Sequence, residues 1–197
     1  MQQNPDRTQA LNLFETYNSS ESLLRHALSV EGVMRNLAGR FPNADADEWA
    51  MAGLLHDLDY EQFPDQHCHK AAEILRANGF DETLVRAVMS HGFGIVTDVE
   101  PISDLEKVLY TMDELTGLIT AAALMRPSRS VMDLELKSLK KKYKTPSFAA
   151  GVDRSIIERG AGLLGWTLDD VLEACILGMR SVASSIGLDG LTQSQET

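Results

Sequence analysis

The feature that most constrains this sequence is an apolar run that ends in a histidine and an aspartate side by side, His56 and Asp57. From Asp47 the chain reads DEWAMAGLLHDL, with acids first and apolar residues then distributed nearly all round a helical projection. This pattern predicts a buried helix. An imidazole or a carboxylate left unsatisfied in an apolar core costs roughly 2 kcal/mol or more. A divalent metal ion would satisfy both groups at once.

For the dipeptide alone, a second interpretation stays open. His56 would be a hydrogen-bonded core histidine, and Asp57 would be an acid at a helix end that pairs with a lysine. Matches of two residues are common by chance. The choice therefore depends on other residues along the chain that are able to bind a metal.

Composition limits the classes of protein to consider. A chain of 197 residues with 44% hydrophobic content is long enough for one domain with a substantial core. A formal net charge of −11 argues against a general nucleic-acid binder or a membrane-surface protein, although a small anionic ligand remains compatible with it. The N-terminus does not resemble a signal peptide and no window approaches 18 apolar residues, so we expect a soluble, cytoplasmic protein. Cys68 and Cys175 do not suggest a disulfide framework.

The pattern of caps and apolar positions predicts an all-α fold. There is no convincing strand alternation and no repeat, so we expect a single compact bundle of about eight or nine helices. Capping residues mark most of the expected helix starts. They are Ser20 for a helix closed by Gly39, Asp81 for one that ends at His91, Ser103, Ser130 with Asp133, Asp153, and Thr167 for a helix that Gly187 stops.

Several further residues with metal-binding side chains lie near apolar helix faces. His26 lies beside the apolar stripe of its helix, and Asp113 lies beside that of a long helix from Ser103. Each has an ordinary explanation when taken alone. Asp113 would be a solvated edge residue, and His91 would be favoured at a helix C-terminus by about 0.3–1 kcal/mol. Together with His56 and Asp57, however, they form a series of candidate ligands.

In chain order, His26, the pair His56-Asp57 and Asp113 match the H…HD…D motif of the HD-domain superfamily of metal-dependent phosphohydrolases. The segment LLHDLDY resembles the family's apolar segment around the pair, and VLYTMDELTGLI resembles the helix that supplies the final aspartate. The resemblance implies an HD-domain-like bundle of the HDIG-like subgroup with additional C-terminal helices. It predicts an N-terminal extension or first helix at 1–18, a metal-binding core at 19–125, a helical extension of the same domain at 126–187 and a flexible tail at 188–197.

The resemblance also implies the ligands. In relatives with two metals, a histidine lies six residues before the glutamate of an A-E-I-L-like helix, which here is Glu73, so His67 is the better match and His69 the second choice. His91 resembles the next family histidine. If both bind, the site holds two ions with Asp57 bridging them. The implied metal ligands are His26, His56, Asp57, His67, His91 and Asp113, with Asp57 and His56 as the catalytic pair and Asp57 orienting the attacking hydroxide.

The chain departs from the family pattern directly after the pair. Many members continue as H-D-I-G-K, whereas this chain has Leu58, Asp59 and Tyr60 in the last three positions, so a lysine used on substrate is missing. Cations are concentrated instead beyond residue 125. They indicate either a solvated helix end or capture of an anionic substrate. The candidate substrate-binding residues are Arg126, Arg129, Lys137 and Lys140.

The predicted ligand types suit one or two divalent ions of Mn, Fe, Co, Ni, Zn or Mg. Such an ion lowers the pKa of a bound water and neutralises phosphoryl oxygens. We therefore expect a metal-dependent phosphohydrolase with a small phosphorylated partner such as a nucleotide, and a homo-oligomer is compatible with the sequence. Two other functions stay open. One is a di-iron oxygenase, which some HD relatives build from six ligands, and the other is a silent regulatory module that binds a nucleotide.

Overall fold

The computed structural model describes residues 5–190, and the part that it describes confirms the all-α prediction. Nine α-helices and one short 3-10 helix make up the regular structure of this range, beside two isolated β-bridges. None of the helices described combines the length and the apolar character that crossing a membrane requires. The bounds are α1 Arg7–Tyr17, α2 Glu21–Ala38, α3 Ala46–Leu55, the 3-10 helix Pro64–Gln66, α4 His69–Ala77, α5 Glu82–His91, α6 Asp104–Leu124, α7 Leu136–Tyr143, α8 Arg154–Leu164 and α9 Leu168–Ser181.

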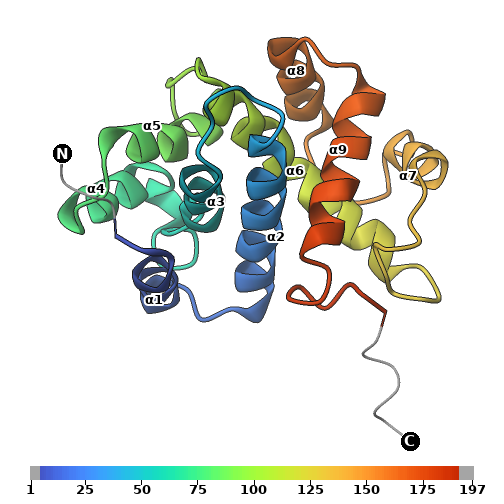
Figure 1. Ribbon diagram of the computed structural model, residues 1–197, viewed down its shortest axis with the longest axis horizontal. Helices are drawn as coiled ribbons and strands as arrows, with labels where there is room; N and C mark the ends of the chain where they lie inside the picture. The colour runs from blue at the N-terminus through green and yellow to red at the C-terminus, as the bar shows by residue number, and fades with distance from the viewer. Residues whose placement is uncertain (1–4, 191–197) are drawn as a thin grey trace, which may run out of the picture.

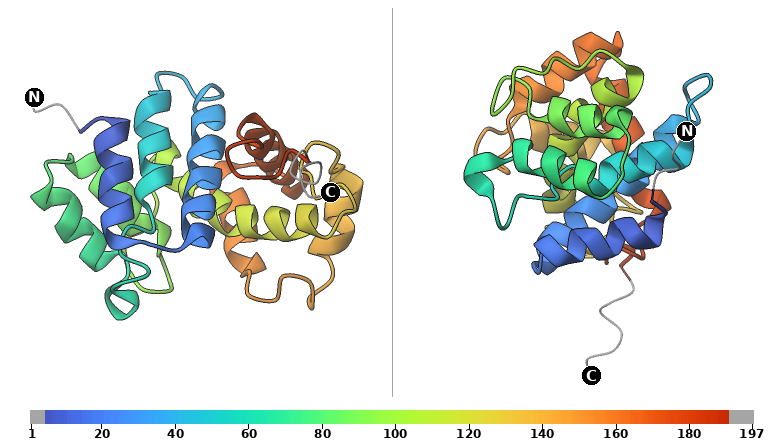
Figure 2. Two further views of the ribbon diagram at one scale, coloured as in Figure 1. Left: turned by 90° about the horizontal axis from the view of Figure 1, so that it is seen from below. Right: turned by 90° about the vertical axis from the view of Figure 1, so that its left-hand side faces the viewer.

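Helix α2 lies at the centre of the bundle. It packs against α3 on one side and α9 on the other, and the long helix α6 crosses behind it (Figure 1). Seen from below, α1, α3 and α2 stand in a row while α6 passes behind α2 and continues away from α1 (Figure 2). Helices α4 and α5 lie beyond α3, whereas α7 and α8 pack on the opposite half of α6. The half of the bundle that contains α2 to α6 therefore brings together all the elements that carry the predicted ligands.

The contact between α2 and α3 depends on a glycine. A Cβ atom on Gly53 would lie 2.8 Å from backbone atoms of Val30 and Glu31, so only a residue without a side chain lets the two helices approach this closely. Trp49, Leu54 and the neighbouring apolar side chains of α3 are buried around this contact. Because Gly53 lies one turn before His56, this close packing also fixes where the His-Asp pair emerges.

Most of the predicted helix ends match the structure. Ser20, Asp81 and Asp153 accept hydrogen bonds from the first-turn amides of α2, α5 and α8. Ser103 and Thr167 each form a complete capping box. These ends were predictable because a cap depends on residues three positions apart in the sequence.

Two predicted helix bounds are wrong. Helix α7 begins at Leu136 instead of following Ser130, because the Ser130 hydroxyl donates to the carbonyl of Leu188 and Asp133 pairs with Arg126. Helix α9 ends at Ser181, six residues before Gly187, and the chain then turns back so that Leu188 packs in the core. Both errors have one cause, a contact between distant segments that local pattern does not contain.

The predicted flexible tail covers two different parts of the chain. Leu188 is fully buried, and its carbonyl also accepts from the amide of Val131. Packing therefore continues beyond the predicted start of the tail. Residues 191–197 lie outside the described part of the chain.

Candidate metal centre

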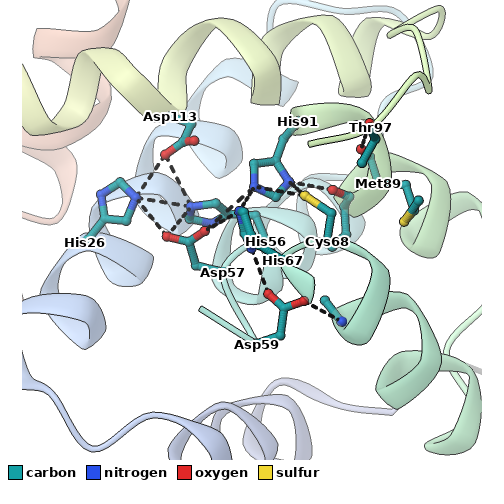
Figure 3. Close-up of polar contacts among 12 residues, drawn as sticks. His26, His56, Asp57, Asp59, His67, Cys68, Met89, His91, Thr97 and Asp113 are labelled. Carbon is teal, nitrogen blue, oxygen red and sulfur yellow. Dashed lines mark hydrogen bonds and ion pairs between the residues drawn. The ribbon is translucent and has the colours of Figure 1, made fainter. Parts of the chain in front are cut away.

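The structure brings the six predicted metal ligands into one cluster, although they come from five separate places in the fold (Figure 3). Each lies where an element ends or faces the interior. His26 comes from α2, His56 caps the C-terminus of α3 and Asp57 follows it, His67 lies just before α4, His91 is the last residue of α5, and Asp113 lies in the middle of α6.

Three of these residues form a compact group at the α2, α3 and α6 side of the cluster. The Nε2 atom of His26 lies 3.1 Å from Nε2 of His56 and 2.9 Å from Oδ1 of Asp113. Nε2 of His56 lies 3.2 Å from the same Asp113 oxygen. Three donor atoms are thus close enough to share one cation.

His67 and His91 form the second group, with their Nε2 atoms 3.2 Å apart. Asp57 lies between the two groups and turns one carboxylate oxygen toward each. Its Oδ2 lies 3.6 Å from His26 and 3.4 Å from His56, whereas its Oδ1 lies 3.5 Å from His67 and 3.7 Å from His91. This is the arrangement that a carboxylate bridging two ions requires.

The outer ring nitrogens of the histidines are held by other groups. Nδ1 of His56 donates to the Gly53 carbonyl over 2.8 Å, and Nδ1 of His91 donates to the Val88 carbonyl. A backbone carbonyl only accepts, so these contacts place the proton on Nδ1 and leave the Nε2 lone pair facing the cluster. Histidines that bind metals are oriented in this way in many proteins.

Asp59 orients His67, a role that the sequence did not indicate. It is fully buried, and its Oδ1 accepts from Nδ1 of His67 over 2.8 Å while its Oδ2 accepts from the amide of Ala71 over 2.7 Å. The carboxylate therefore ties the residues after the His-Asp pair to the start of α4. The one sequence signal that could have pointed to Asp59 is its position two residues after Asp57. The sequence does not show which histidine it contacts.

His69, the second choice as a ligand, points elsewhere. Its Nε2 lies 3.2 Å from the carbonyl of Val96, and the residue is exposed. The structure thus brings His67 into the cluster and leaves His69 outside it.

The pKa values of His56, His67 and His91 are raised when only protein groups surround them. Burial by itself would lower the pKa of His56, but the carboxylates of Asp57 and Asp113 raise it from 6.5 to about 10. Burial likewise opposes protonation of His67, and the Asp59 carboxylate raises its pKa to about 9. The site is therefore built to hold positive charge, which a metal ion supplies in place of these protons.

The pKa values of the acids in and beside the cluster shift in two directions. Burial would raise the pKa of Asp57 and of Asp113, but His56 and the other imidazoles hold both well below the usual 3.8. Glu114, the next residue along α6, has its pKa raised to about 7 by burial and then by the charge of Asp113. The two acids inside the cluster are therefore held as anions, as the predicted ligands would be, whereas Glu114 is not held in its charged form.

A cavity of about 410 Å³ opens over the cluster. Five of the six predicted ligands line it, and only His56 is covered. Apolar side chains make up much of the remaining wall, with Tyr60, Tyr110 and Glu114 as its other polar residues. The apolar residues are Leu23, Ile95, Val96, Val152 and Ile156.

None of the four basic residues predicted to bind substrate lines this cavity. Arg126 pairs with Asp133 over 2.8 Å and Lys140 pairs with Asp169 over 2.6 Å. Arg129 and Lys137 lie in the same segment as these two residues, beyond residue 125. That these residues bind substrate stays a prediction.

A different cation reaches the cavity wall. Arg159 of α8 is exposed, and its Nη1 donates to the hydroxyl of Tyr110 over 3.3 Å. The guanidinium also passes close to Gly94, where a Cβ atom would lie 3.1 Å from Nη1. Sequence reasoning missed Arg159 because its helix follows the basic segment and carries no motif.

The donor set fits divalent ions. Four imidazoles and two carboxylates converge in a buried cluster that is open to solvent through one cavity, and the outer nitrogens of His56, His67 and His91 have fixed hydrogen-bond acceptors. Nitrogen and oxygen donors of this kind suit Mn, Fe, Co, Ni and Zn.

Comparison with known proteins agrees with this geometry. A family profile described as HD domain matches residues 23–118, which contain all six predicted ligands. The chain is also 28% identical over 173 residues to a tRNA (cytidine(56)-2'-O)-methyltransferase of Picrophilus torridus, a match that covers 85% of this chain and 50% of that protein. The chain thus spans about half the length of this curated relative. No solved structure matches the chain significantly.

Proposed function

Because the chain belongs to the HD-domain superfamily, we propose that it is a metal-dependent phosphohydrolase acting on a nucleotide or another small phosphorylated metabolite. The observation that carries this proposal is the position of Asp57, whose two oxygens face two separate histidine groups at the base of one cavity. A divalent ion held there would supply a bound water of lowered pKa and would neutralise charge on a phosphoryl oxygen. The proposal concerns only this chain and not the whole of its curated relative, because the match covers 50% of that relative's length.

The residues of the chain have distinct roles in this proposal. His26, His56 and Asp113 hold one cation, His67 and His91 hold the other, and Asp57 spans both. Asp57 also lines the cavity, so its free lone pairs are able to orient an attacking water. His56 is fully buried and acts only as a ligand that the Gly53 carbonyl keeps in place.

The cavity favours a small substrate. Its volume of about 410 Å³ lies near the lower end of the range of about 300–1,000 Å³ that is usual for small-molecule sites. The apolar wall suits the body of a nucleoside or a similar group, and Arg159 at the wall is placed for a phosphate oxygen. A folded nucleic acid or a protein would reach the metals only through a protruding end.

A phosphatase screen tests the proposal. The tag-free protein would be loaded separately with Mn, Co, Ni and Mg and given nucleoside phosphates, sugar phosphates and phosphodiesters. We expect release of phosphate or of a phosphomonoester with at least one metal, and we expect Asp57→Ala to be folded, inactive and depleted of metal. Asp65→Ala, which removes an exposed acid nearby, should retain full activity. Inactivity of folded, metal-loaded protein on every substrate class would contradict the proposal.

A di-iron oxygenase is the second candidate function. Two features favour this function. The candidate donors lie in two groups, and the cavity wall is mostly apolar, which suits an apolar substrate that makes few charged contacts. Aerobically purified protein would then contain iron, show a mixed-valent signal and consume oxygen with a substrate. Activity with Mn or Mg on a phosphate ester, in protein free of iron, would decide for the hydrolase.

The methyltransferase activity in the name of the Picrophilus relative is not part of this proposal. The relative is 28% identical and the match covers only 50% of its length, so its named activity is not carried over to this chain. A regulatory module that binds a nucleotide without turnover remains an outcome of the screen. In that case a saturating nucleotide would raise stability by RT ln(1 + [L]/Kd), about 2.7 kcal/mol at a hundredfold excess over Kd, without product.

A further inference from the structure

The predicted ligands contain only nitrogen and oxygen donors, but a sulfur atom lies beside the second histidine group. Cys68 follows His67 directly, is fully buried, and has its Sγ 3.8 Å from both ring nitrogens of His91. The donor atoms of His67, Cys68 and His91 all lie within 4.8 Å of one another. The second half of the metal centre therefore includes a thiol that the motif does not require.

The local backbone is arranged to direct this thiol inward. Cys68 has φ 67° and ψ −45°, a conformation that residues with side chains rarely adopt. It occupies the N-cap position of α4 but makes no side-chain capping hydrogen bond, although capping is the usual role of a polar residue at this position. Gly92 lies against it, and a Cβ atom there would come within 2.7 Å of Sγ. Strain of this kind is most often retained at functional sites.

The distances suit one tetrahedral ion. Zinc binds nitrogen at about 2.0–2.1 Å and sulfur at about 2.3 Å, so a tetrahedral ion holds its nitrogen and sulfur donors about 3.3–3.6 Å apart. Nε2 of His67 lies 3.2 Å from Nε2 of His91, which in turn lies 3.8 Å from Sγ of Cys68. Oδ1 of Asp57 lies 3.5 and 3.7 Å from the two nitrogens and is the next candidate donor.

An independent observation points to a cation at the same place. Nδ1 of His91 donates to the Val88 carbonyl and Nδ1 of His67 donates to Asp59, which leaves two Nε2 lone pairs facing each other across 3.2 Å. Two acceptors at this distance need positive charge between them, which a proton on one nitrogen or a bound metal ion supplies. The thiol lies at the edge of the same gap.

We propose that Cys68 is a thiolate ligand of the ion held by His67, His91 and Asp57. The two halves of the centre then differ in chemistry. The half formed by His26, His56 and Asp113 has nitrogen and oxygen donors only and takes a hard or borderline ion, whereas the half with sulfur selects a softer ion such as zinc. The inference rests on the metal centre of the proposed function, but not on which substrate is cleaved.

Cobalt substitution tests this assignment without reference to activity. Tag-free protein stripped of metal would be titrated with Co²⁺, and its absorption would be recorded in the near ultraviolet, where a thiolate bound to cobalt gives a charge-transfer band. We expect the band in the wild-type protein and its loss in Cys68→Ser and Cys68→Ala. Cys175→Ser is the matched control, because Cys175 is equally buried but lies in α9 outside both groups of metal-binding side chains, and it should retain the band.

Two further measurements use the same proteins. X-ray absorption of the zinc-loaded wild-type protein should show sulfur at about 2.3 Å, a result that needs no variant. Cys68→Ser should lose about tenfold or more in zinc affinity at one ion, with a smaller change for manganese, because oxygen replaces a soft donor.

The outcomes separate this inference from the proposed function. Bound cobalt without a charge-transfer band, or a band that survives in Cys68→Ala, would overturn the role of Cys68 and leave the hydrolase proposal intact. A band together with failure of every phosphate substrate would overturn the hydrolase proposal alone. Absence of any cobalt binding would overturn both.

Discussion

At the scale of single residues, the sequence indicated the ligands of the centre but not the residues that orient them. Asp57 and Asp113 were recognisable because acids next to apolar stripes are unusual and fit a known motif. Asp59 and Arg159 were not, because Asp59 meets His67 only through the fold of the loop between α3 and α4, and Arg159 meets Tyr110 from another helix. Such pairings depend on how helices pack and leave no periodic signal in the sequence.

The first residue-scale prediction concerns Asp59. In Asp59→Asn the side chain keeps its size but loses its charge and cannot accept from both His67 and Ala71 with carboxylate oxygens. Loss of an outer contact of this kind typically costs about 10- to 100-fold in metal affinity. We expect that loss for one ion only, measured by competition with a chromophoric chelator. Asp65→Asn is the control, and equal isotherms for the two variants would contradict the role of Asp59.

The second prediction concerns Arg159. If its guanidinium binds a phosphate oxygen, Arg159→Ala should raise KM by about tenfold, which corresponds to about 1.4 kcal/mol, with a small change in kcat. Arg126→Ala provides a matched control, because Arg126 pairs with Asp133, whereas Arg159 donates to Tyr110 in the cavity wall. Steady-state kinetics on the substrate found by the screen would measure both variants. A larger effect from Arg126→Ala would move substrate binding back to the basic segment beyond residue 125.

At the scale of elements, most helix bounds were predicted well, including the ends of α2 before Gly39 and of α5 at His91, and the two errors are the start of α7 and the end of α9. The capping boxes at Ser103 and Thr167 satisfy amides within four residues of themselves, so the sequence contains all the necessary information. The segment before α7 has a similar pattern at Ser130, yet that hydroxyl bonds to Leu188. A contact that spans 58 residues competes with the cap and determines the local structure.

The loop after α3 is fixed in the same non-local way. The side chain of Asn18 donates to the carbonyl of Leu58 over 2.9 Å, and the Glu61 carboxylate accepts from the amides of Ser19 and Ser20. These bonds tie the loop that follows Asp57 to the junction between α1 and α2. No local pattern indicates these bonds, although they fix the loop that begins at the Asp57 carboxylate.

The element-scale prediction concerns the approach of α2 to α3. Gly53→Ala places a methyl group 2.8 Å from the backbone of α2, which neither helix is able to avoid by a side-chain rotation. Overpacking of this kind costs about 1–3 kcal/mol of unfolding free energy, and the shift of α3 should also move His56 and weaken metal binding. Gly162→Ala, on α8 with open space around it, is the control and should be neutral or stabilising. Urea unfolding of both variants, with and without metal, would measure the effect. A Gly53→Ala variant as stable as the control would contradict the close contact.

At the scale of the whole molecule, the HD-domain superfamily and the all-α fold were predictable and are confirmed, whereas the HDIG-like subgroup stays a prediction. The predicted ligands were also drawn together from α2 to α6, because the motif is distributed over successive helices of one bundle. What remained unpredictable is the cavity above them. Its walls come from segments as far apart as Leu23 and Ile156, whose meeting depends on the packing of the complete bundle.

The pKa values predict how metal-free protein responds to pH. Groups whose pKa is raised by folding, such as His56 to about 10 and His67 to about 9, add stability that is complete below 6.5 and is lost as pH rises through those values. Asp57 and Asp113, whose pKa values are lowered, add stability above 3.8 that is lost as pH falls. Chelator-treated protein should therefore be most stable between pH 3.8 and 6.5 and should lose stability toward pH 9.

Bound metal should reverse the alkaline part of this response, because the ion competes with protons for the same imidazoles. Urea unfolding at several pH values, with EDTA and with excess Mn²⁺, would measure both curves. His67→Gln should flatten the metal-free curve between pH 6.5 and 9, since it removes one of the raised groups. Metal-free stability that rises across this interval would contradict the assignment of the cluster.

The most direct test of the whole proposal is the number of divalent ions bound by each chain. Equilibrium dialysis of tag-free, chelator-stripped protein against Mn²⁺ or Co²⁺ would give this number for the wild type and for three folded variants. A centre with two groups of ligands predicts two ions in the wild type, loss of one ion in Asp113→Ala, loss of the other in His67→Ala, and weakened binding of both in Asp57→Ala. A wild-type protein that binds no ion, or an Asp57→Ala variant with unchanged stoichiometry and affinity, would contradict the metal centre.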